Sequence, residues 1–138
     1  MINFTIPGKA KALKRHRPSA KGGYYDPSSK DKKQIWLQIA KYCPKKPLEG
    51  SIYLKLIFYM SRPKNHYRTG KYKHLLKDSC KDTIYHKKKP DIDNLAKFYM
   101  DLFNNGFYKD DSQICVLQAE KMYSFVDVPR TEVTIQEI

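Results

Sequence analysis

Residues 87–114 read KKKPDIDNLAKFYMDLFNNGFYKDDSQI, and this stretch decides both the fold and the candidate site. Its five acidic residues are all aspartates, and three lysines stand directly before the first of them. Pro90 disfavours a helical conformation at Lys89 and so favours an extended entry. Side chains two residues apart in an extended segment point to the same side, so we expect Asp91 and Asp93 to share one target.

The segment after Asp93 is expected to be a helix, with Asp93 as its N-cap. Its apolar residues recur at helical spacing and form one face: they are Leu95, Phe98, Tyr99, Leu102 and Phe103. Asn94, Lys97 and Asp101 lie on the other side. Lys97 is one turn beyond Asp93, so its ammonium is expected to reach the place where the aspartates converge. Asn104-Asn105-Gly106 tolerates left-handed backbone geometry and ends the helix.

A second pair of aspartates, Asp110 and Asp111, stands just ahead of an apolar stretch that is expected to be a strand. A strand there would bring this pair back toward Asp91 and Asp93. Clustered carboxylates repel one another unless a cation holds them, and oxygen ligands suit a divalent metal ion. An N-cap aspartate and an Asp-Asp turn are also ordinary structural devices, and either pair alone would favour that interpretation. The two pairs together, with Lys97 and the lysine run, favour a metal site.

Two other families that use Asp-x-Asp fit the sequence poorly. A haloacid-dehalogenase-type phosphatase would have a buried apolar strand before the pair, where this chain has Lys-Lys-Lys-Pro. A metal-dependent glycosyltransferase would need a nucleotide-sugar domain, for which the chain is too short. The full pattern is K-P-D-x-D-N-L-x-K-x-x-x-D-x-L, an Asn/Gly turn, and then K-D-D-x-Q-I. It spans about a fifth of the chain with ordered spacing and resembles the RusA family of Holliday-junction resolvases.

The resemblance implies roles for several residues of this block. The metal-binding catalytic aspartates of the family correspond to Asp91, Asp93 and Asp111, with Asp110 as a neighbour at the metal site. Lys97 corresponds to a helix lysine that the family needs for cleavage, and Asp101 matches a recurrent helix aspartate that we interpret as structural. The resemblance also implies a homodimer that acts on four-way or otherwise branched DNA with Mg²⁺ or Mn²⁺ and nicks two strands symmetrically.

The charge of the chain favours a polyanionic partner. Its 138 residues include 27 Lys and Arg against 14 Asp and Glu, which gives a net charge of +13. Residues 61–89 carry ten basic and two acidic side chains, whereas residues 101–138 carry three basic and seven acidic ones. Such an excess concerns association rather than fold. At this length we expect one domain, residues 1–138, with a modest core.

Two basic stretches are candidate DNA contacts. Residues 61–89 lack a sustained hydrophobic period and are expected to form a long basic loop, in which tyrosines are interleaved with lysines and arginines. The loop ends in Lys87, Lys88 and Lys89, directly before the first aspartate. Near the N-terminus, a segment without acidic residues loosely resembles a basic stretch of the family through Lys14, Arg15 and Arg17. We expect these stretches to contact phosphates, with a solvated loop as the alternative.

The cysteines, the histidines and the apolar segments of the sequence indicate the cellular location of the protein. Three scattered cysteines suit a reducing cytosol better than a disulfide framework, and the four histidines show no zinc-ligand spacing with them. The N-terminus lacks the apolar core of a signal peptide, and no segment has the length and apolarity of a membrane span. We therefore expect a cytoplasmic protein without a membrane partner.

The rest of the chain is expected to supply strands and a second helix. Alternating apolar residues predict strands at residues 2–6, 51–60, 114–125 and 131–138, the second of them central. An apolar stripe predicts a helix that begins after Pro27 and ends near Tyr42. Gly22-Gly23 predicts a turn, beside which Tyr24 and Tyr25 are expected to pack, with stacking on bases as the alternative. The element order gives an α+β domain, a mixed β-sheet packed by two main helices, RusA-like and homodimeric.

These observations predict phosphodiester hydrolysis at a DNA branch point. One or two divalent ions held by the aspartates would lower the pKa of a bound water and stabilise charge on the phosphate. Lys97 would support the charged phosphate or orient the attacking water. Two alternatives stay open: a less selective branch or flap nuclease, and a non-catalytic nucleic-acid-binding module whose aspartates only cap and turn the chain.

Overall fold

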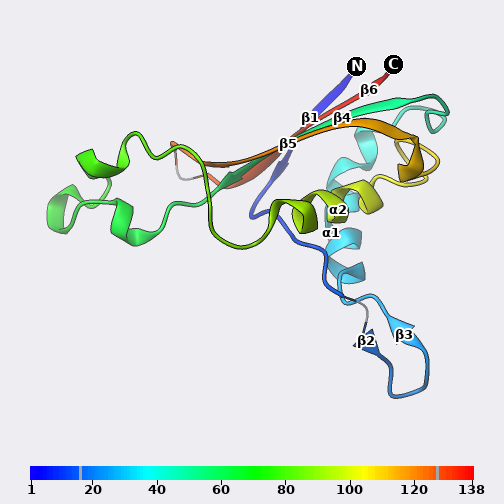
Figure 1. Ribbon diagram of the computed structural model, residues 1–138, viewed down its shortest axis with the longest axis horizontal. Helices are drawn as coiled ribbons and strands as arrows, with labels where there is room; N and C mark the ends of the chain where they lie inside the picture. Colours follow the sequence, from blue (N-terminus) through cyan, green and yellow to red (C-terminus); the bar gives the residue numbers. More distant parts are fainter. Residues whose placement is uncertain (16, 127) are drawn as a thin grey trace.

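The computed structural model describes residues 1–15, 17–126 and 128–138, and the side chain of Arg17 lies outside this description. Four strands form one mixed sheet in the order β1-β6-β4-β5 (Figure 1). These strands are β1 (Ile2–Pro7), β4 (Ile52–Met60), β5 (Ile114–Tyr123) and β6 (Arg130–Glu137). β6 pairs antiparallel with β1 and β4, whereas β4 pairs parallel with β5. Parallel neighbours need a crossover connection, and residues 61–113 provide it.

Two helices lie on one side of this sheet (Figure 1). They are α1 (Ser29–Ile39), which a 3-10 turn η1 (Ala40–Tyr42) extends, and α2 (Ile92–Leu102). α1 contacts β1, α2 contacts β5, and the two helices contact each other. The predicted α+β arrangement of a mixed sheet packed by two helices is therefore confirmed. None of the helices in the described ranges is long and apolar enough to cross a bilayer.

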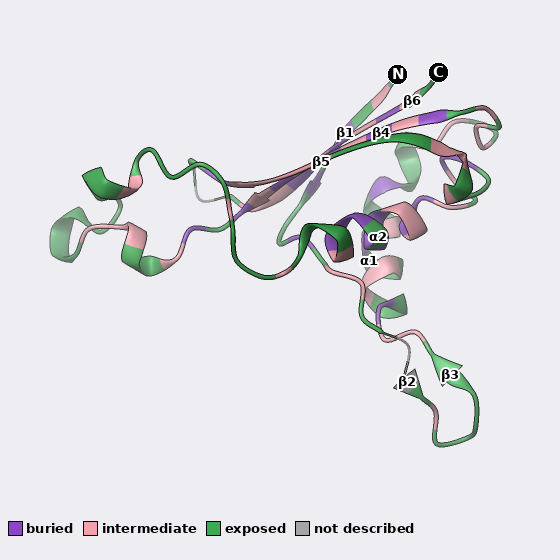
Figure 2. Cartoon of the chain, in the orientation of Figure 1, coloured by how far each residue is buried: buried purple, intermediate pink, exposed green. Residues whose placement is uncertain are grey.

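The core lies between the sheet and the helices (Figure 2). Alternate residues of β4 are buried, from Ile52 to Met60, and the residues between them are half-buried, which confirms a central strand. The predicted apolar face of α2 is buried in full, because Leu95, Phe98, Tyr99, Leu102 and Phe103 all lie in this core. Packing of that face against the sheet holds α2 in place and leaves its polar side, with Lys97, exposed.

The turn after α2 packs against α1. Asn105 has a φ of 67°, the left-handed geometry that the Asn-Asn-Gly sequence predicts. Gly106 is needed for a different reason, because a Cβ there would lie 2.0 Å from Cη2 of Trp36. Trp36, which is half-buried on α1, packs edge-on against Phe107 with 6.1 Å between ring centroids. α1 therefore supports the turn that leads on to Asp110.

A small hairpin projects below the helices (Figure 1). It pairs β2 (Arg17–Pro18) with β3 (Tyr24–Tyr25), and Gly22 and Gly23 make the predicted turn with φ values of 91° and 73°. Tyr24 and Tyr25 are 77% and 49% exposed. The expectation that these tyrosines pack against the protein is therefore wrong, since the hairpin carries them away from the core.

Residues 61–89 form an arm that projects from the opposite side of the protein (Figure 1). The arm contains no α-helix and no strand of the sheet. Its only regular pieces are three 3-10 turns: η2 (Lys64–His66), η3 (Gly70–Tyr72) and η4 (Asp78–Cys80). Its two sides are joined where Arg68 N–H donates to the carbonyl of Leu75 at 2.8 Å and Lys77 N–H donates to that of His66 at 2.9 Å.

Candidate functional site

Asp91 and Asp93 lie at the N-terminal end of α2. Asp91 is the N-cap, with extended backbone angles (φ −70°, ψ 144°), and its side chain makes no capping hydrogen bond. The prediction of Asp93 as N-cap is therefore wrong by two residues. The extended conformation that a proline imposes falls on Lys89, before Pro90, and leaves the chain free to begin the helix directly after Asp91. Asp93 lies within the first turn.

Asp91 and Asp93 both line one open pocket. Its volume is about 600 Å³, and it is lined by Tyr85, His86, Lys87, Asp91, Ile92, Asp93, Ala119, Glu120 and Lys121. Both aspartates are exposed, and neither makes a hydrogen bond or ion pair with another side chain in the described ranges. Their oxygens are therefore free to take an external cation, with Lys87 on the same wall.

Lys121 crosses this pocket from β5. Its ammonium donates to the carbonyl of Lys88 at 2.5 Å and to that of Pro90 at 2.7 Å. Beside it, the His86 N–H donates to the carbonyl of Lys121 at 3.1 Å, and Tyr123 N–H donates to that of Ile84 at 2.7 Å. The chain that leads into Asp91 is thus held along the end of β5. Sequence reasoning missed Lys121.

The second pair of aspartates is organised by a 3-10 turn, η5 (Asp111–Gln113). Asp110 is its N-cap and accepts from Ser112 N–H at 3.2 Å. Hydrogen bonding by the Ser112 side chain, and then by its N–H, lowers the pKa of Asp110. Gln113 closes the turn, since its Oε1 accepts from Asp110 N–H at 2.9 Å. Its Nε2 donates to the carbonyls of Leu48 and Gly50, each at 2.9 Å. Gln113 therefore ties this turn to the chain just ahead of β4.

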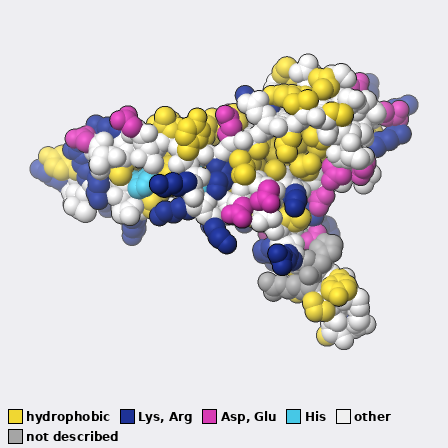
Figure 3. All heavy atoms as spheres, viewed as in Figure 1, with side chains coloured by type: hydrophobic (Ala, Val, Ile, Leu, Met, Phe, Trp, Pro, Cys, Tyr) yellow, Lys and Arg dark blue, Asp and Glu magenta, His cyan; other side chains and the backbone are white. Residues whose placement is uncertain are grey.

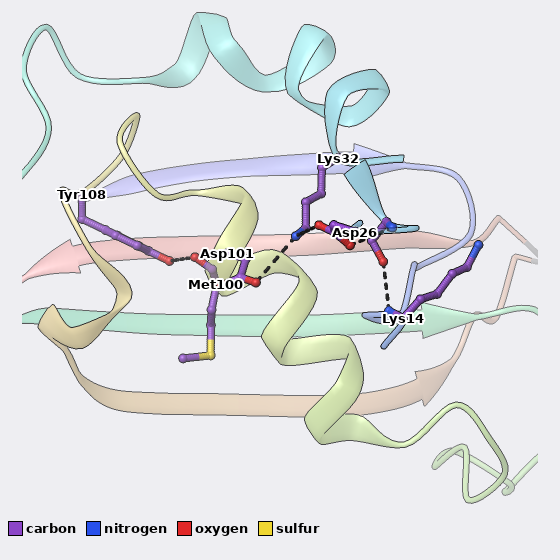
Figure 4. Close-up of polar contacts among 7 residues, drawn as sticks. Lys14, Asp26, Lys32, Met100, Asp101 and Tyr108 are labelled. Atoms are coloured by element: carbon purple, nitrogen blue, oxygen red, sulfur yellow. Dashed lines mark hydrogen bonds and ion pairs between the residues drawn. The ribbon is translucent and has the colours of Figure 1, made fainter. Parts of the chain in front are cut away.

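Asp111 lies beside Asp101, at the C-terminal end of α2. Partial burial, and then repulsion by the carboxylates of Asp110 and Asp101, raise the pKa of Asp111. Asp101 in turn forms an ion pair with Lys32 of α1 at 3.6 Å, and Lys32 also contacts Asp26 at 2.9 Å (Figure 4). Asp101 therefore joins the two helices and also faces the second aspartate pair.

Tyr108 lies at the C-terminal end of α2, near Asp101 and Asp111. Its hydroxyl donates to the carbonyl of Met100 at 2.7 Å (Figure 4). Burial is the main cause that raises the pKa of Tyr108 far above its usual range, and the nearby Asp111 and Asp101 add to it. Tyr108 is therefore a neutral hydrogen-bond donor that fixes the last turn of α2 beside the carboxylates.

The aspartates are thus gathered in two groups, not in the single pocket that the sequence predicts. α2 rises about 1.5 Å per residue, so Asp101 lies about 15 Å along the axis from Asp91. The turn after α2 is short, so Asp111 stays near Asp101. The chain then runs along β5, and Lys121, near the end of this strand, lies beside Asp91. Among the described residues, no three His, Cys, Asp or Glu side chains are placed to hold one metal ion together. The roles of Asp110 and Asp111 as metal ligands stay predictions.

The N-terminal basic segment lies along α2. Lys11 N–H donates to the hydroxyl of Tyr99 at 3.0 Å, and Leu13 N–H donates to the carbonyl of Asn94 at 3.0 Å. Lys14 and Arg15 are exposed, and the Lys14 ammonium lies 4.0 Å from Asp31. Two of the three predicted DNA contacts of this segment are therefore close to the helix that bears Asp93. The side chain of the third, Arg17, lies outside the described residues.

Basic side chains also cover the arm and its junction with α2. Figure 3 shows Lys and Arg side chains spread over the arm, and acidic side chains gathered where the arm meets the helices. Lys87, Lys88 and Lys89 are exposed, immediately before Asp91. A second pocket of about 310 Å³ lies on the arm and is lined by Arg62, Lys64, Tyr67, Lys73 and His74. Basic side chains therefore lie along the arm and at its end, next to the Asp91–Asp93 pocket (Figure 3).

Arg62 anchors the base of the arm and was missed by sequence reasoning. It is only 5% exposed. Its guanidinium donates to the carbonyls of Ser124 at 3.3 Å, Cys80 at 3.2 Å and Thr83 at 2.9 Å. It also lies 5.2 Å from the ring centroid of Tyr123. Because it joins its own segment to residues 80–83 and to Ser124, Arg62 fixes where the arm leaves the sheet.

The family of the chain follows from its whole length. A family model described as endodeoxyribonuclease RusA matches residues 7–136. The chain belongs to the RusA endodeoxyribonuclease family. This match confirms the resemblance that rests on the aspartate block and extends it over residues 7–136. The chain is also 32% identical over 142 residues to the uncharacterized protein YqaN of Bacillus subtilis (strain 168). The aligned region covers 99% of this chain and 96% of YqaN.

Proposed function

We propose that this RusA-family protein is a metal-dependent endodeoxyribonuclease that resolves Holliday junctions by paired symmetric nicks, in DNA recombination and repair. The observation that supports this most directly is the pocket at the start of α2. Two aspartates with free carboxylates, Asp91 and Asp93, line it beside Lys87. Anionic and cationic groups side by side on an open surface suit a phosphodiester that must be both bound and cleaved.

The donor set of this pocket fits Mg²⁺ or Mn²⁺. Mg²⁺ is commonly held by one or two carboxylates together with waters and substrate phosphate oxygens, and it does not need an all-protein cage. Asp91 and Asp93 provide such a pair. When bound, the ion would lower the pKa of a bound water and offset charge on the phosphate. Asp110 and Asp111 would contribute from the other group only if the two ends of α2 serve one substrate.

Lys97 is proposed to act on the same phosphate. It is exposed on α2, one turn beyond Asp93, and no ion pair with a described residue occupies its ammonium. A fixed positive charge that is not neutralised by the protein stabilises negative charge that develops on a phosphate oxygen. Lys97 would therefore support the transition state or orient the attacking water, while Asp91 and Asp93 hold the ion.

The remaining basic residues are proposed to bind the DNA backbone. Their candidates are Lys14, Arg15, Arg17, Lys87, Lys88 and Lys89, with the arm as a further contact. Contacts between lysine or arginine and phosphates release counterions, so binding should weaken steeply as salt rises. Lys14 and Arg15 belong to the segment that lies along α2, and Lys87, Lys88 and Lys89 lead directly into it, which would direct the scissile strand to the Asp91–Asp93 pocket.

A homodimer is proposed from the free edge of β5. Residues 112–119 carry no charged side chain, although 30% of the chain is charged. Val116 and Leu117 are each 45% exposed on this edge strand, and among the described residues only its end, near Lys121, is covered by residues 84–86. Proteins usually protect such edges with charges, prolines or bulges. A second copy paired there would give two sites for the two strands of a symmetric junction.

A panel of DNA substrates tests the proposed activity. Wild-type protein would be incubated with Mg²⁺ or Mn²⁺ and a synthetic four-way junction, a flap and a linear duplex of matched sequence. We expect paired nicks at symmetric positions of the junction and little cutting of the duplex. Equal cutting of all three would favour a broader branch nuclease. Tight junction binding without nicks in either metal would favour a non-catalytic binding module.

A further inference from the structure

We propose that Lys121 is a positioning residue that sets the orientation of Asp91 in the proposed nuclease site. This inference rests on the proposed metal-dependent function. Its basis is a pair of hydrogen bonds from one ammonium to two carbonyls, those of Lys88 and Pro90, at 2.5 and 2.7 Å. The second acceptor belongs to the residue directly before Asp91.

The position of Lys121 in the sheet explains how it reaches these carbonyls. Lys121 is in register with Phe58 of the parallel strand β4, and in-register residues of neighbouring strands point to the same face. Phe58 is fully buried against the helices, so the Lys121 side chain also leaves the sheet on the helix side. Its half-buried stem therefore directs the ammonium at the chain that enters α2.

The backbone around Lys121 holds the same segment from a second point. The carbonyl of Lys121 accepts from His86 N–H at 3.1 Å, and residues Tyr85 and Met122 form an antiparallel bridge. Residues 84–86 are thus fixed on the edge of β5 by backbone hydrogen bonds, and residues 88–90 by the lysine side chain. The Lys121 ammonium adds a further positive charge beside the exposed lysines 87–89, so its hydrogen bonds to the two carbonyls hold this segment against the repulsion among these lysines.

The acceptors of Lys121 matter for the chemistry of the site. Its ammonium is directed at carbonyls, and it makes no ion pair with Asp91, Asp93 or any other acidic side chain in the described ranges. A lysine paired with Asp91 would compete with a metal ion for the same oxygens. Lys121 instead orders the backbone that bears Asp91 and leaves both carboxylates available.

The test compares Lys121→Met, Lys121→Arg and, as the matched control, Lys55→Met, which alters a half-buried lysine of β4. Mn²⁺ affinity of each protein is measured without DNA by electron paramagnetic resonance, and amide exchange of residues 84–93 is measured by mass spectrometry. Loss of a group that orients a metal ligand typically weakens metal binding about 10- to 100-fold. We expect a loss of about that size and faster exchange for Lys121→Met, partial rescue for Lys121→Arg, and no change for Lys55→Met.

The Mn²⁺ concentration for half-maximal junction nicking should rise by the same factor in Lys121→Met. Junction affinity in Ca²⁺ should stay within about two-fold of wild type, because no phosphate contact is lost. If wild type and Lys121→Met bind Mn²⁺ equally, the inference is wrong and the nuclease proposal stands. The inference is equally wrong if junction affinity falls while Mn²⁺ affinity is unchanged, since Lys121 is then a phosphate contact. A wild type that binds no Mn²⁺ removes the proposed function and this inference with it.

Discussion

The carboxylate of Asp111 lies beside that of Asp101, and partial burial, followed by repulsion from Asp110 and Asp101, raises the pKa of Asp111. This contact is at the C-terminal end of α2, whereas Asp91 and Asp93 are at its N-terminal end. The acidic residues of the aspartate block therefore form two groups with different surroundings. The first faces an open pocket, and the second is bound into the packing of α1, α2 and η5.

Removal of the Asp111 charge should stabilise the folded protein at neutral pH. Folding raises the pKa of Asp111. The contribution of this carboxyl to the free energy of unfolding is therefore fully present below the ordinary aspartate pKa, and it is lost as pH rises through the raised pKa. Asp111→Asn should therefore raise the Tm at pH 7 by about 1–2 °C. The difference from wild type should vanish below about pH 4, where the carboxyl is neutral. Thermal unfolding over a pH series measures this.

Asp78→Asn is the matched control for this prediction. Asp78 lies on the arm, where a hydrogen bond from Lys81 and the nearby Arg68 lower its pKa. Neutralising it should leave the Tm at pH 7 unchanged or slightly reduced, the opposite direction from Asp111→Asn. A lower Tm for Asp111→Asn at pH 7 would show that Asp111 is held by favourable contacts and that repulsion does not dominate.

Gly106→Ala should destabilise the fold through Trp36. A Cβ at residue 106 would overlap the Trp36 ring, so either the ring or the turn has to move. Overpacking of this kind typically costs about 1–3 kcal/mol. Urea unfolding would measure the loss, and the double variant Gly106→Ala, Trp36→Ala should lose less than the sum of the single variants. Additive losses would contradict a direct clash between these two residues.

Arg62→Met should loosen the arm. The substitution keeps an apolar stem against Tyr123 but removes the donor to the carbonyls of Ser124 and Thr83, the first of these in a buried hydrogen bond. Such a buried loss typically costs about 1–3 kcal/mol. Amide exchange across residues 63–83 should become faster, and junction binding should weaken. Arg68→Met, which alters a less buried arginine on the same arm, is the control; equal effects of both variants would mean that Arg62 is not the anchor.

The lysines before Asp91 should set part of the salt dependence of DNA binding. Replacement of Lys87, Lys88 and Lys89 by Ala should weaken junction binding and lower the slope of log affinity against log salt by up to about 0.9 per lost phosphate contact. The control replaces Lys45 and Lys46, which are exposed between η1 and β4. Fluorescence anisotropy over a salt series measures both slopes. An unchanged slope in the triple variant would exclude phosphate contacts by these lysines.

The parts of the fold that could be predicted from the sequence are those with a strong local period. The buried face of α2 and the alternation of β4 follow from side-chain spacing alone. The N-cap was predicted two residues late because aspartate is equally favourable as a cap at both positions. The sequence predicted that Tyr24 and Tyr25 pack against the protein. Composition does not show that they lie on a projecting hairpin whose two strands are two residues long each.

The site shows the limit of such reasoning more clearly. The aspartates were expected to converge because their spacing suits a helix and a returning strand, but the position of Asp111 depends on the length and direction of the turn after α2. Arg62 and Lys121 were missed because their acceptors are backbone carbonyls. Every residue has a carbonyl, so no residue type in the sequence marks the partner of a buried arginine or a positioning lysine.

The central claim is that Asp91 and Asp93 hold the divalent ion on which junction cleavage depends, and Asp93→Asn tests it most directly. Nicking of a four-way junction in Mn²⁺ and junction affinity in Ca²⁺ would be measured on the same preparations. Loss of a metal ligand should reduce the nicking rate on the order of 100-fold or more. Junction affinity should be kept or increased, because a negative charge that repels phosphates is removed. A variant that nicks the junction at the wild-type rate would contradict the account.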